Sequence, residues 1–386
     1  MRIIGFAPNS WHGQWVNRQQ LLSRLGRKHR VVYSTGAWSI WDRTSPAFRA
    51  APLVGRFDPA DNVLVDIAPR LLVRWPKLPA YDALVMRWHA RRLRGHIGAD
   101  ATPLLALIFH PLFVDYLQPL RADAVAYHAY DLFEDTPGWN DSLDAMERRL
   151  LREADLVTAV SESIASRLRE KAGREVRVLP NGVDLNAFDG ARGTPFVEPL
   201  ELARIPRPRL GYVGSLHPQV DYALVARLAK SRPDWHFVFV GGRGSLADTR
   251  ANAEVAMCER CPNVHWVDEK HRSEVPACLM SMDANLMVYR LADATWIKGI
   301  YPLKLHEYLA AGKPVVSADI PSVREFSSVV RIASDDASWL ASIEDALERG
   351  GTGTEHERQA VAAANTWDSR VARLDSWLAD TVAKRR

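Results

Sequence analysis

Two patterns of apolar residues alternate along the chain. Short apolar runs are typical of buried strands, and segments in which apolar residues recur every three or four positions are typical of helices with one buried face. Their alternation favours parallel sheets covered by helices. In the first half the patterns predict strands at Arg2–Phe6, Arg30–Tyr33, Leu104–Phe109, Ala124–Tyr127, Leu156–Val160 and Val176–Leu179, and helices at Val16–Arg27, Ser142–Glu153 and Glu162–Lys171.

The alternation stops near the middle of the chain and then starts again. Four prolines lie between residues 190 and 208, which is typical of a linker. The fold class is therefore α/β, with two Rossmann-like domains at 1–190 and 209–365, a linker at 191–208, and a cleft expected between the domains. In the second half we predict strands at Arg209–Val213, His236–Val240, Val264–Val267, Ala284–Tyr289, Val315–Ser317 and Val329–Ile332, helices at Val220–Lys230, Glu274–Met280, Leu303–Ala311 and Trp339–Glu348, and helix throughout Glu355–Lys384.

Length and composition agree with this organisation. The chain has 386 residues, of which 47% are apolar and 25% are charged, as in packed two-domain proteins and unlike disordered chains. The longest apolar runs are far shorter than the roughly 20 residues of a membrane-spanning helix. The first apolar stretch is broken by Pro8 and is too short for a secretory signal, and three cysteines make no disulfide framework. We expect a cytoplasmic protein.

Charge is distributed unevenly. Residues 1–121 contain 17 Lys and Arg against 7 Asp and Glu, together with six of the 13 tryptophans. Within this third, the segment 81–94 joins apolar and basic faces, as do helices that lie on anionic membranes. The alternative is a helix packed in the core with a solvated arginine face. Nucleic acid would also attract this charge, but the tryptophans belong to no recognisable RNA- or DNA-reading motif.

The segment 301–317 carries the clearest candidate chemistry. Its pattern predicts a helix with Pro302 in its first turn, ended by Gly312 and followed by a buried strand. Lys304 and Glu307 then share one face near the helix N-terminus, where anions are favoured. The lysine suits a diphosphate and the glutamate suits a pair of ribose hydroxyls. An ordinary ion pair on a solvated helix is the alternative.

This segment resembles the donor-binding helix of GT-B glycosyltransferases, especially family-4-like enzymes of bacterial surface-polysaccharide assembly. The same resemblance is carried by segments 155–162, 179–184 and 211–216. It implies a nucleotide-sugar donor, no bound metal, and a final helix at 366–386 that crosses back to the first domain. The donor-binding residues that it implies are Gly214, Ser215, Tyr301, Leu303, Lys304 and Glu307.

Two departures from the family pattern bear on mechanism. Many members place a second glutamate eight residues before the one that matches Glu307, but here that position is Gly299. The basic residues that commonly follow the glycine loop are also absent. Lys304 then becomes the leading phosphate ligand, as in the subgroup that resembles the xanthan glucuronosyltransferase, and retaining chemistry cannot be assumed.

A catalytic base is sought in the first domain. The loop at 127–139 contains several acidic residues after a predicted strand, and Asp131 matches the aspartate of the xanthan-type subgroup. A partly shielded carboxylate suits proton abstraction from an acceptor hydroxyl. Helix capping is the alternative role for Asp131, and His110 and His128 are rival bases.

The first loop is the candidate acceptor site. By resemblance, His12 and Gly13 would contact the acceptor together with His110, although His12 and Trp15 suit packing equally well. No metal site is predicted. Zinc is disfavoured at Cys258, Cys261, His265 and His271 because an intervening strand separates these residues, and Asp335 and Asp336 precede a helix that one of them can cap.

Together these observations predict a glycosyltransferase at the inner face of the cell membrane. It would transfer a sugar, from UDP rather than GDP, to a lipid-linked oligosaccharide, with inversion and with Asp131 as the base. Two alternatives remain. One is a retaining GT-B enzyme that uses a GDP-sugar or a soluble acceptor, and the other is a nucleotide-sugar-binding protein without turnover.

Overall fold

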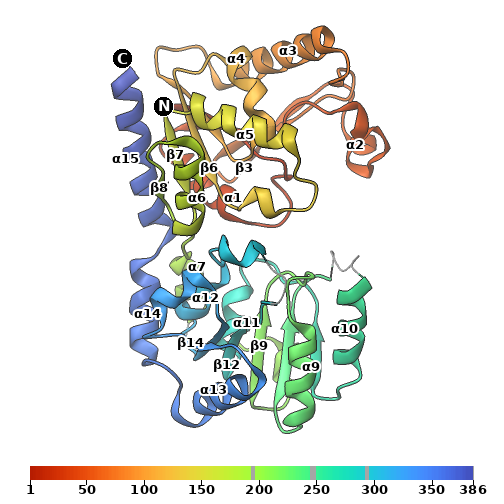
Figure 1. The fold of residues 1–386 in the computed structure, drawn as a ribbon, viewed down its shortest axis with the longest axis vertical. Helices are drawn as coiled ribbons and strands as arrows, with labels where there is room; N and C mark the ends of the chain where they lie inside the picture. The colour runs from red at the N-terminus through yellow and green to blue at the C-terminus, as the bar shows by residue number, and fades with distance from the viewer. Residues whose placement is uncertain (193–195, 244–248, 292–294, 386) are drawn as a thin grey trace. The chain divides into compact units, whose positions relative to one another are not determined.

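The computed structural model divides into two compact units (Figure 1). It describes residues 1–192, 196–243, 249–291 and 295–385. The first unit contains Met1–Pro180 and Asp368–Arg386, and the second contains Asn181–Trp367. Among the described residues, no helix has both the length and the apolar character needed to cross a membrane.

The first unit is built on an eight-stranded sheet. The strands lie in the order β3-β4-β2-β1-β5-β6-β7-β8 and pair in parallel, except for the antiparallel pair β3–β4. The wholly buried β1 and β5 are neighbours near its centre. The strands are β1 (Arg2–Phe6), β2 (Arg30–Ser34), β3 (Arg56–Ala60), β4 (Val63–Ile67), β5 (Leu104–Ile108), β6 (Ala124–Ala129), β7 (Leu156–Ala159) and β8 (Arg177–Val178).

Helices cover this sheet, and their ends follow from local chemistry. The side chains of Asn140 and Ser161 accept hydrogen bonds from the first turns of α5 and α6, as N-cap residues do. Gly173 ends α6 in the left-handed conformation that glycine adopts without strain. The α-helices are α1 (Asn17–Leu25), α2 (Pro46–Ala50), α3 (Pro79–Ile97), α4 (Leu117–Leu120), α5 (Asp141–Glu153), α6 (Glu162–Ala172) and α15 (Trp367–Arg385).

The last helix, α15, packs against the first unit (Figure 1). Leu374 and Leu378 on this helix are fully buried. Asp375 accepts a 2.6 Å contact from the ring of His29, and Arg385 donates to Asp155 over 2.6 Å. Apolar burial and ion pairs therefore both join α15 to the first unit.

The second unit is built on a six-stranded parallel sheet. Its order is β11-β10-β9-β12-β13-β14, so that β9 lies beside both β10 and β12. The strands are β9 (Arg209–Val213), β10 (His236–Val240), β11 (Val264–Val267), β12 (Ala284–Met287), β13 (Val315–Ala318) and β14 (Arg331–Ala333). The helices are α7 (Leu185–Ala191), α8 (Leu200–Ala203), α9 (Tyr222–Ser231), α10 (Thr249–Glu259), α11 (Val275–Met280), α12 (Lys304–Ala310), α13 (Asp336–Arg349) and α14 (Glu355–Ala364).

The unit boundary lies at Pro180, before the predicted boundary at residue 190. The reason is that the chain joins the second unit directly after β8. The backbone N–H of Val183 donates to the carbonyl of Asn365, and that of Trp367 donates to the carbonyl of Val183. The predicted linker contains α8 and belongs to the second unit, and its residues 193–195 lie outside the described residues.

Two further elements differ from prediction. The segment Glu355–Lys384 is two helices, because Asn365 and Thr366 pair with Val183 between them. The hairpin β3–β4 was not predicted. It turns at Asp61 and Asn62, both with positive φ, and this two-residue turn suits the twist of the strands.

Candidate functional site

In the second unit, the candidate donor residues gather where β9 ends. Gly214 follows this strand with φ +136°. A Cβ atom there would lie 2.5 Å from Cε and 2.7 Å from Nζ of Lys304, the first residue of α12. The positive φ and this close approach both favour glycine at the point where the lysine lies against the strand end.

Tyr308 fixes this arrangement. Its hydroxyl accepts from the backbone N–H of Val213 over 2.9 Å and donates to the carbonyl of the same residue over 3.2 Å. Because Tyr308 lies on α12 one turn after Lys304, the end of β9 and the start of α12 are held together. Gly214 and Lys304 are adjacent for this reason.

The ammonium group of Lys304 lies among aromatic side chains. Its Nζ is 4.8 Å from the centre of the Tyr212 ring. The charge and hydrogen bonding of Lys304 act to lower the pKa of Tyr289, although burial dominates and raises that pKa to about 12. Within the described part of the chain, Lys304 forms no ion pair, so the predicted alternative of a Lys304–Glu307 salt bridge is not formed.

Glu307 is partly exposed one turn into α12. Burial raises the pKa of its carboxyl to about 7, with Asp184 adding to the rise and Lys304 opposing it. The group therefore changes charge near neutral pH. Neither oxygen is engaged by a hydrogen bond from the described residues, which leaves both oxygens able to accept hydrogen bonds from a ligand.

The other predicted donor residues adjoin this cluster. Ser215 and Leu303 are partly exposed, and the carbonyl of Ser215 accepts from the hydroxyl of Tyr212 over 3.2 Å. Tyr301 is buried. Its hydroxyl contacts Nε2 of His306 at 2.8 Å, and its carbonyl accepts a hydrogen bond from Asn181 over 2.6 Å. Tyr301 therefore has a packing role in the structure.

Sequence reasoning missed the residues that surround Lys304. His217 lies in the loop after β9, where burial and then the charge of Lys304 lower its pKa to about 3. Its ring lies 6.3 Å from that of Tyr289. In the sequence, the one hint of this environment was Tyr289, the last residue of the predicted strand at 284–289.

In the first unit, Asp131 lies just beyond β6 and is partly exposed. Burial raises the pKa of its carboxyl and the neighbouring Asp135 adds to the rise, whereas the backbone N–H of Leu132, which donates to Oδ1 over 2.9 Å, opposes it. Asp131 caps no helix, since Asn140 caps α5. A carboxylate with a raised pKa accepts a proton more readily, which suits a general base.

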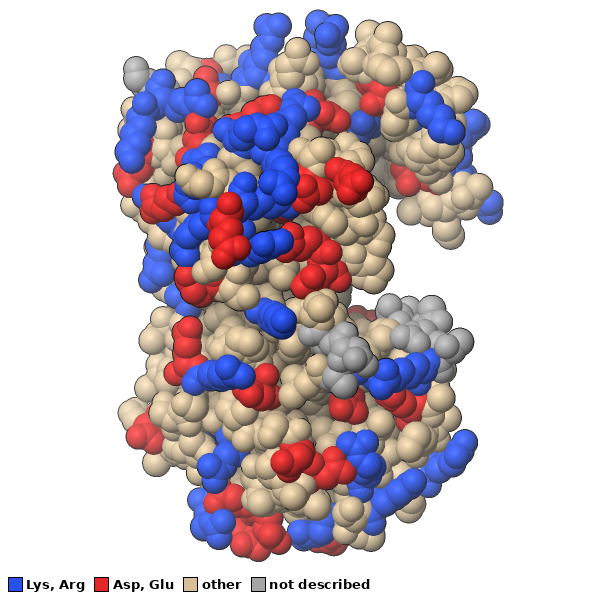
Figure 2. Space-filling model, viewed as in Figure 1, with Lys and Arg blue, Asp and Glu red and all other residues tan. Residues whose placement is uncertain are grey.

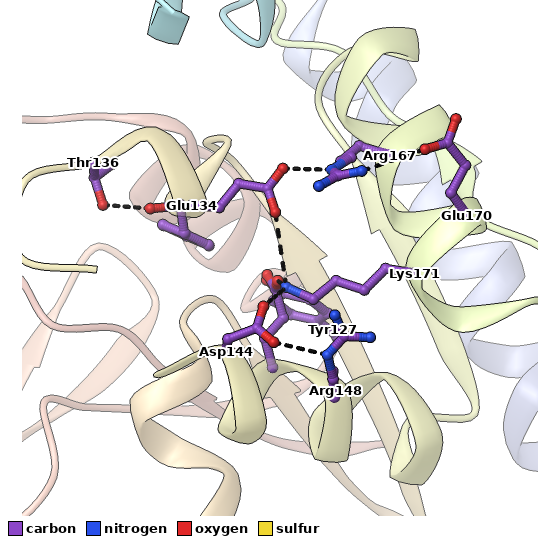
Figure 3. A network of polar contacts seen from close by, with 10 residues as sticks. Tyr127, Glu134, Thr136, Asp144, Arg148, Arg167, Glu170 and Lys171 are labelled. Atoms are coloured by element: carbon purple, nitrogen blue, oxygen red, sulfur yellow. Dashed lines mark hydrogen bonds and ion pairs between the residues drawn. The ribbon is translucent and has the colours of Figure 1, made fainter. Parts of the chain in front are cut away.

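Figure 3 shows how the loop that carries Asp131 is anchored. Glu134 in this loop pairs with Arg167 over 2.5 Å and approaches Lys171 to 3.9 Å. The Lys171 side chain is 4% exposed and also pairs with Asp144 and with Glu147, the latter over 2.6 Å. The loop is thus tied to α5 and α6, and Glu134 is engaged in ion pairs.

The two rival histidines have structural contacts. His128 is buried, with Nδ1 2.8 Å from the hydroxyl of Thr158, and burial lowers its pKa to about 3. His110 accepts the backbone N–H of Leu112 over 3.2 Å, and its pKa falls to about 4 through burial and the charge of Arg18. Both rings are neutral at physiological pH.

A cavity of about 1050 Å³ opens within the first unit. His12 lines it, whereas Gly13, His110 and Asp131 do not. Gly13 instead closes a turn by donating to the carbonyl of Ser10 over 3.3 Å. The lining comes from the carboxyl ends of β1, β2 and β4 and from α3, the edge at which parallel sheets bind ligands.

The cysteines discounted as zinc ligands are buried thiols. The Sγ of Cys258 donates to the carbonyl of Tyr222 over 3.1 Å. The described residues contain no group of three His, Cys, Asp or Glu side chains suited to a metal ion. Asp335 caps α13, as the sequence predicted.

Family models match both halves of the chain. The model described as Glycosyltransferase Family 4 matches residues 22–187, and the model described as Glycosyl transferases group 1 matches residues 207–349. The chain therefore contains two glycosyltransferase domains, at residues 22–187 and 207–349. It is 30% identical over 236 residues to the putative teichuronic acid biosynthesis glycosyltransferase TuaH of Bacillus subtilis strain 168. That match spans 58% of this chain and 57% of the relative.

Solved structures of this fold cover nearly all of the glycosyltransferase chain. Anabaena Alr3699/HepE in complex with UDP-glucose superposes with a TM-score of 0.69 at 15% identity, covering 98% of this chain and 99% of that one. A trehalose-6-phosphate structure from E. coli, bound with UDP-2-fluoro glucose, superposes with a TM-score of 0.68 at 12% identity, and 99% of each chain is covered. At these identities the likeness establishes the GT-B fold alone.

Proposed function

We propose that this protein transfers a sugar from a nucleoside diphosphate donor to a lipid-linked oligosaccharide in the assembly of a cell-surface glycan. One observation carries the proposal. The ammonium group of Lys304 lies against the glycine at the end of β9 without a carboxylate partner among the described residues. Such a cation beside a glycine at the end of a strand suits a diphosphate.

The second unit supplies the donor chemistry. Lys304 stabilises the negative charge that develops on the departing diphosphate, and Glu307 accepts hydrogen bonds from the ribose hydroxyls. UDP is favoured because Alr3699/HepE and the E. coli structure are both complexes with UDP-sugars. The surface-glycan role is supported by the similarity to TuaH, a putative glycosyltransferase of teichuronic acid biosynthesis.

The first unit supplies the acceptor chemistry, with Asp131 as the base. The acceptor oxygen forms a bond to the anomeric carbon as the bond to the diphosphate breaks, and the hydroxyl proton passes to Asp131. One such displacement inverts the anomeric centre. NMR of the product distinguishes it from the retaining alternative, which produces the opposite anomer.

Lys304→Ala tests the donor site. Loss of a charge contact made in the transition state is expected to reduce kcat for UDP release, measured with membrane extract, by about 100-fold or more. Lys298→Ala is the matched control, because Lys298 is exposed six residues earlier. Unchanged turnover in Lys304→Ala contradicts the proposal, and absence of turnover in the unmodified protein favours a binding protein.

The proposed acceptor carries a lipid, and the first unit offers a surface suited to an anionic membrane. Among the described residues, nine of the thirteen exposed large apolar side chains lie between residues 41 and 88. On α3, Tyr81, Leu84 and Trp88 are exposed and lie at helical spacing, apart from the buried Val85 and His89. The exposed face of α3 carries these apolar side chains together with Arg87 and Arg91, so it has the solvated arginines of the alternative interpretation as well as the apolar groups of a membrane-binding helix.

Basic residues surround this apolar surface. Between residues 41 and 91 the exposed charged side chains are Arg43, Arg49, Arg56, Lys77, Arg87, Arg91 and the single acid Asp61. Figure 2 shows basic side chains among uncharged residues on the part of the first unit that carries α2. Apolar stripes bordered by Lys and Arg bind anionic bilayers through burial and charge together.

Sedimentation with liposomes tests this surface. The protein is expected to bind vesicles that contain phosphatidylglycerol and not vesicles of phosphatidylcholine alone. Leu84→Glu with Trp88→Glu should abolish binding. Val197→Glu, at an exposed apolar position of the second unit, is the control. Equal binding by the double variant and the control contradicts the membrane assignment.

A further inference from the structure

Arg18 is a buried cation at the start of α1. The residue is 5% exposed, and its Nε atom has no hydrogen-bond partner. It forms no ion pair with any residue that the structure describes. A buried charge without a counter-charge is unfavourable unless a ligand provides one.

Other buried arginines show what is missing. Arg24, on the same helix and also 5% exposed, pairs with Asp368 over 3.4 Å. Arg209 pairs with Glu198 over 2.6 Å, and Arg2 pairs with Asp100 over 3.6 Å. The buried Arg358 has no such pair, but it donates to four backbone carbonyls. Among the described residues, Arg18 has neither kind of partner, and the groups near it include Tyr33, Tyr130 and His110.

Two tyrosines position the Arg18 guanidinium. Its carbon lies 4.7 Å from the centre of the Tyr130 ring. The charge and hydrogen bonding of Arg18 act to lower the pKa values of Tyr33 and Tyr130, although burial dominates and raises both. Tyr33 also donates to the carbonyl of Asn9. The guanidinium is therefore held in a fixed place without being neutralised.

This place is where a parallel sheet binds ligands. Arg18 follows β1, Tyr33 lies in β2, His110 follows β5 and Tyr130 follows β6. Tyr130 and His110 are partly exposed, so the cluster reaches solvent. His110 is close enough to Arg18 for the arginine to lower its pKa, and Tyr130 adjoins the proposed base Asp131.

We propose that Arg18 is an anion-binding residue of the first unit, and that the ligand bound there carries an oxyanion, either a carboxylate or a phosphate. This inference rests on the proposed function in taking that ligand to be the acceptor. A planar guanidinium binds either group through paired hydrogen bonds. The oxyanion then supplies the counter-charge that the protein itself lacks at Arg18.

Thermal-shift measurements test the site with glucuronate and glucose 6-phosphate as probes. Glucose is the neutral control, and potassium chloride matches ionic strength. Either anion is expected to raise the Tm of the unmodified protein, and the more effective one distinguishes carboxylate from phosphate. Arg18→Met should weaken the affinity for the anion, as reported by the Tm shift, by about 10- to 100-fold, and Arg24→Met should retain that affinity.

Two readouts keep the test decisive. If Arg18→Met does not fold, Arg18→Lys is used, and the imidazole signals of His110 are followed by NMR. Bound anion is expected to raise the pKa of His110 from about 4. Absence of an anion-dependent Tm shift in the unmodified protein, or an undiminished shift in Arg18→Met, overturns the proposal. Lys304→Ala should keep the anion response, so failure here is distinct from failure of the donor site.

Discussion

At the scale of single residues, Glu307 links the donor site to pH. Burial raises the pKa of its carboxyl from 4.5 to about 7. Above that pKa the group is an ionised acceptor for two hydroxyls, and below it the added proton removes part of this capacity. The raised pKa is thus a cost of placing a carboxylate beside β9.

A pH titration of donor binding checks this. UDP affinity is expected to increase between pH 6 and pH 8 in the unmodified protein, whereas Glu307→Gln should bind more weakly with little dependence on pH. Because the folded state holds this proton more tightly than the unfolded chain, the contribution of Glu307 to stability declines as pH rises from 4.5 to about 7. Identical pH profiles for the two proteins would contradict the assignment.

Asp131 gives a second prediction at this scale. Removing a general base is expected to lower kcat by about 10²- to 10⁴-fold, so Asp131→Asn should lose turnover while keeping UDP affinity. Asp135→Asn, four residues later in the same loop, is the control. Similar activity of both variants would assign the base elsewhere.

The residues of the candidate sites could be predicted only in part from the sequence. The sequence itself shows the helical spacing and the charges of Lys304 and Glu307. The rings of Tyr212, Tyr289 and His217 around the ammonium are not, because they come from separate strands and loops that only the folded sheet brings together. Arg18 was overlooked for the same reason, since nothing in the sequence shows that a particular arginine lacks a carboxylate.

At the scale of elements, Lys171 on α6 contacts both α5 and the loop that carries Asp131 (Figure 3). Its side chain is almost wholly buried and pairs with Glu134, Asp144 and Glu147. Removing the cation leaves three carboxylates close together with less compensation. The loop that carries Asp131 would then lose its contact with Lys171 and keep the pair between Glu134 and Arg167 of α6.

Lys171→Met is expected to reduce the free energy of unfolding by about 3–5 kcal/mol, as for other broken buried ion pairs. Urea titration measures this. Arg167→Met removes a pair between more exposed groups and should cost about 1 kcal/mol or less. Comparable losses in the two variants would show that burial of Lys171 does not set its contribution.

Most elements were predictable because their strands are wholly buried and read as continuous apolar runs. The exceptions have physical reasons. Strand β3 is only partly buried and contains Pro59, so it gives no apolar run, and the signal for the hairpin is the Asp61-Asn62 turn. The break between α14 and α15 depends on pairing with Val183, a residue that is distant in sequence.

At the scale of the whole molecule, the first unit depends on a helix from the far end of the described chain. Besides its ion pairs, α15 places Trp377 5.3 Å from the guanidinium of Arg177, beside β8. Deleting residues 368–386 exposes the apolar surface beneath Leu374 and Leu378. Calorimetry should then show a first unit that unfolds at a lower temperature while the second unit still binds UDP. Unchanged unfolding of the first unit would mean that α15 adds little to its stability.

The placement of α15 also sets an order of events during translation. Residues 368–385 leave the ribosome after every residue of the second unit, yet they complete the first. The domain that is made first must therefore wait, with its groove for this helix uncovered, until its neighbour has been made. Nascent chains stalled before residue 368 should accordingly recruit chaperones at the earlier domain and not at the later one.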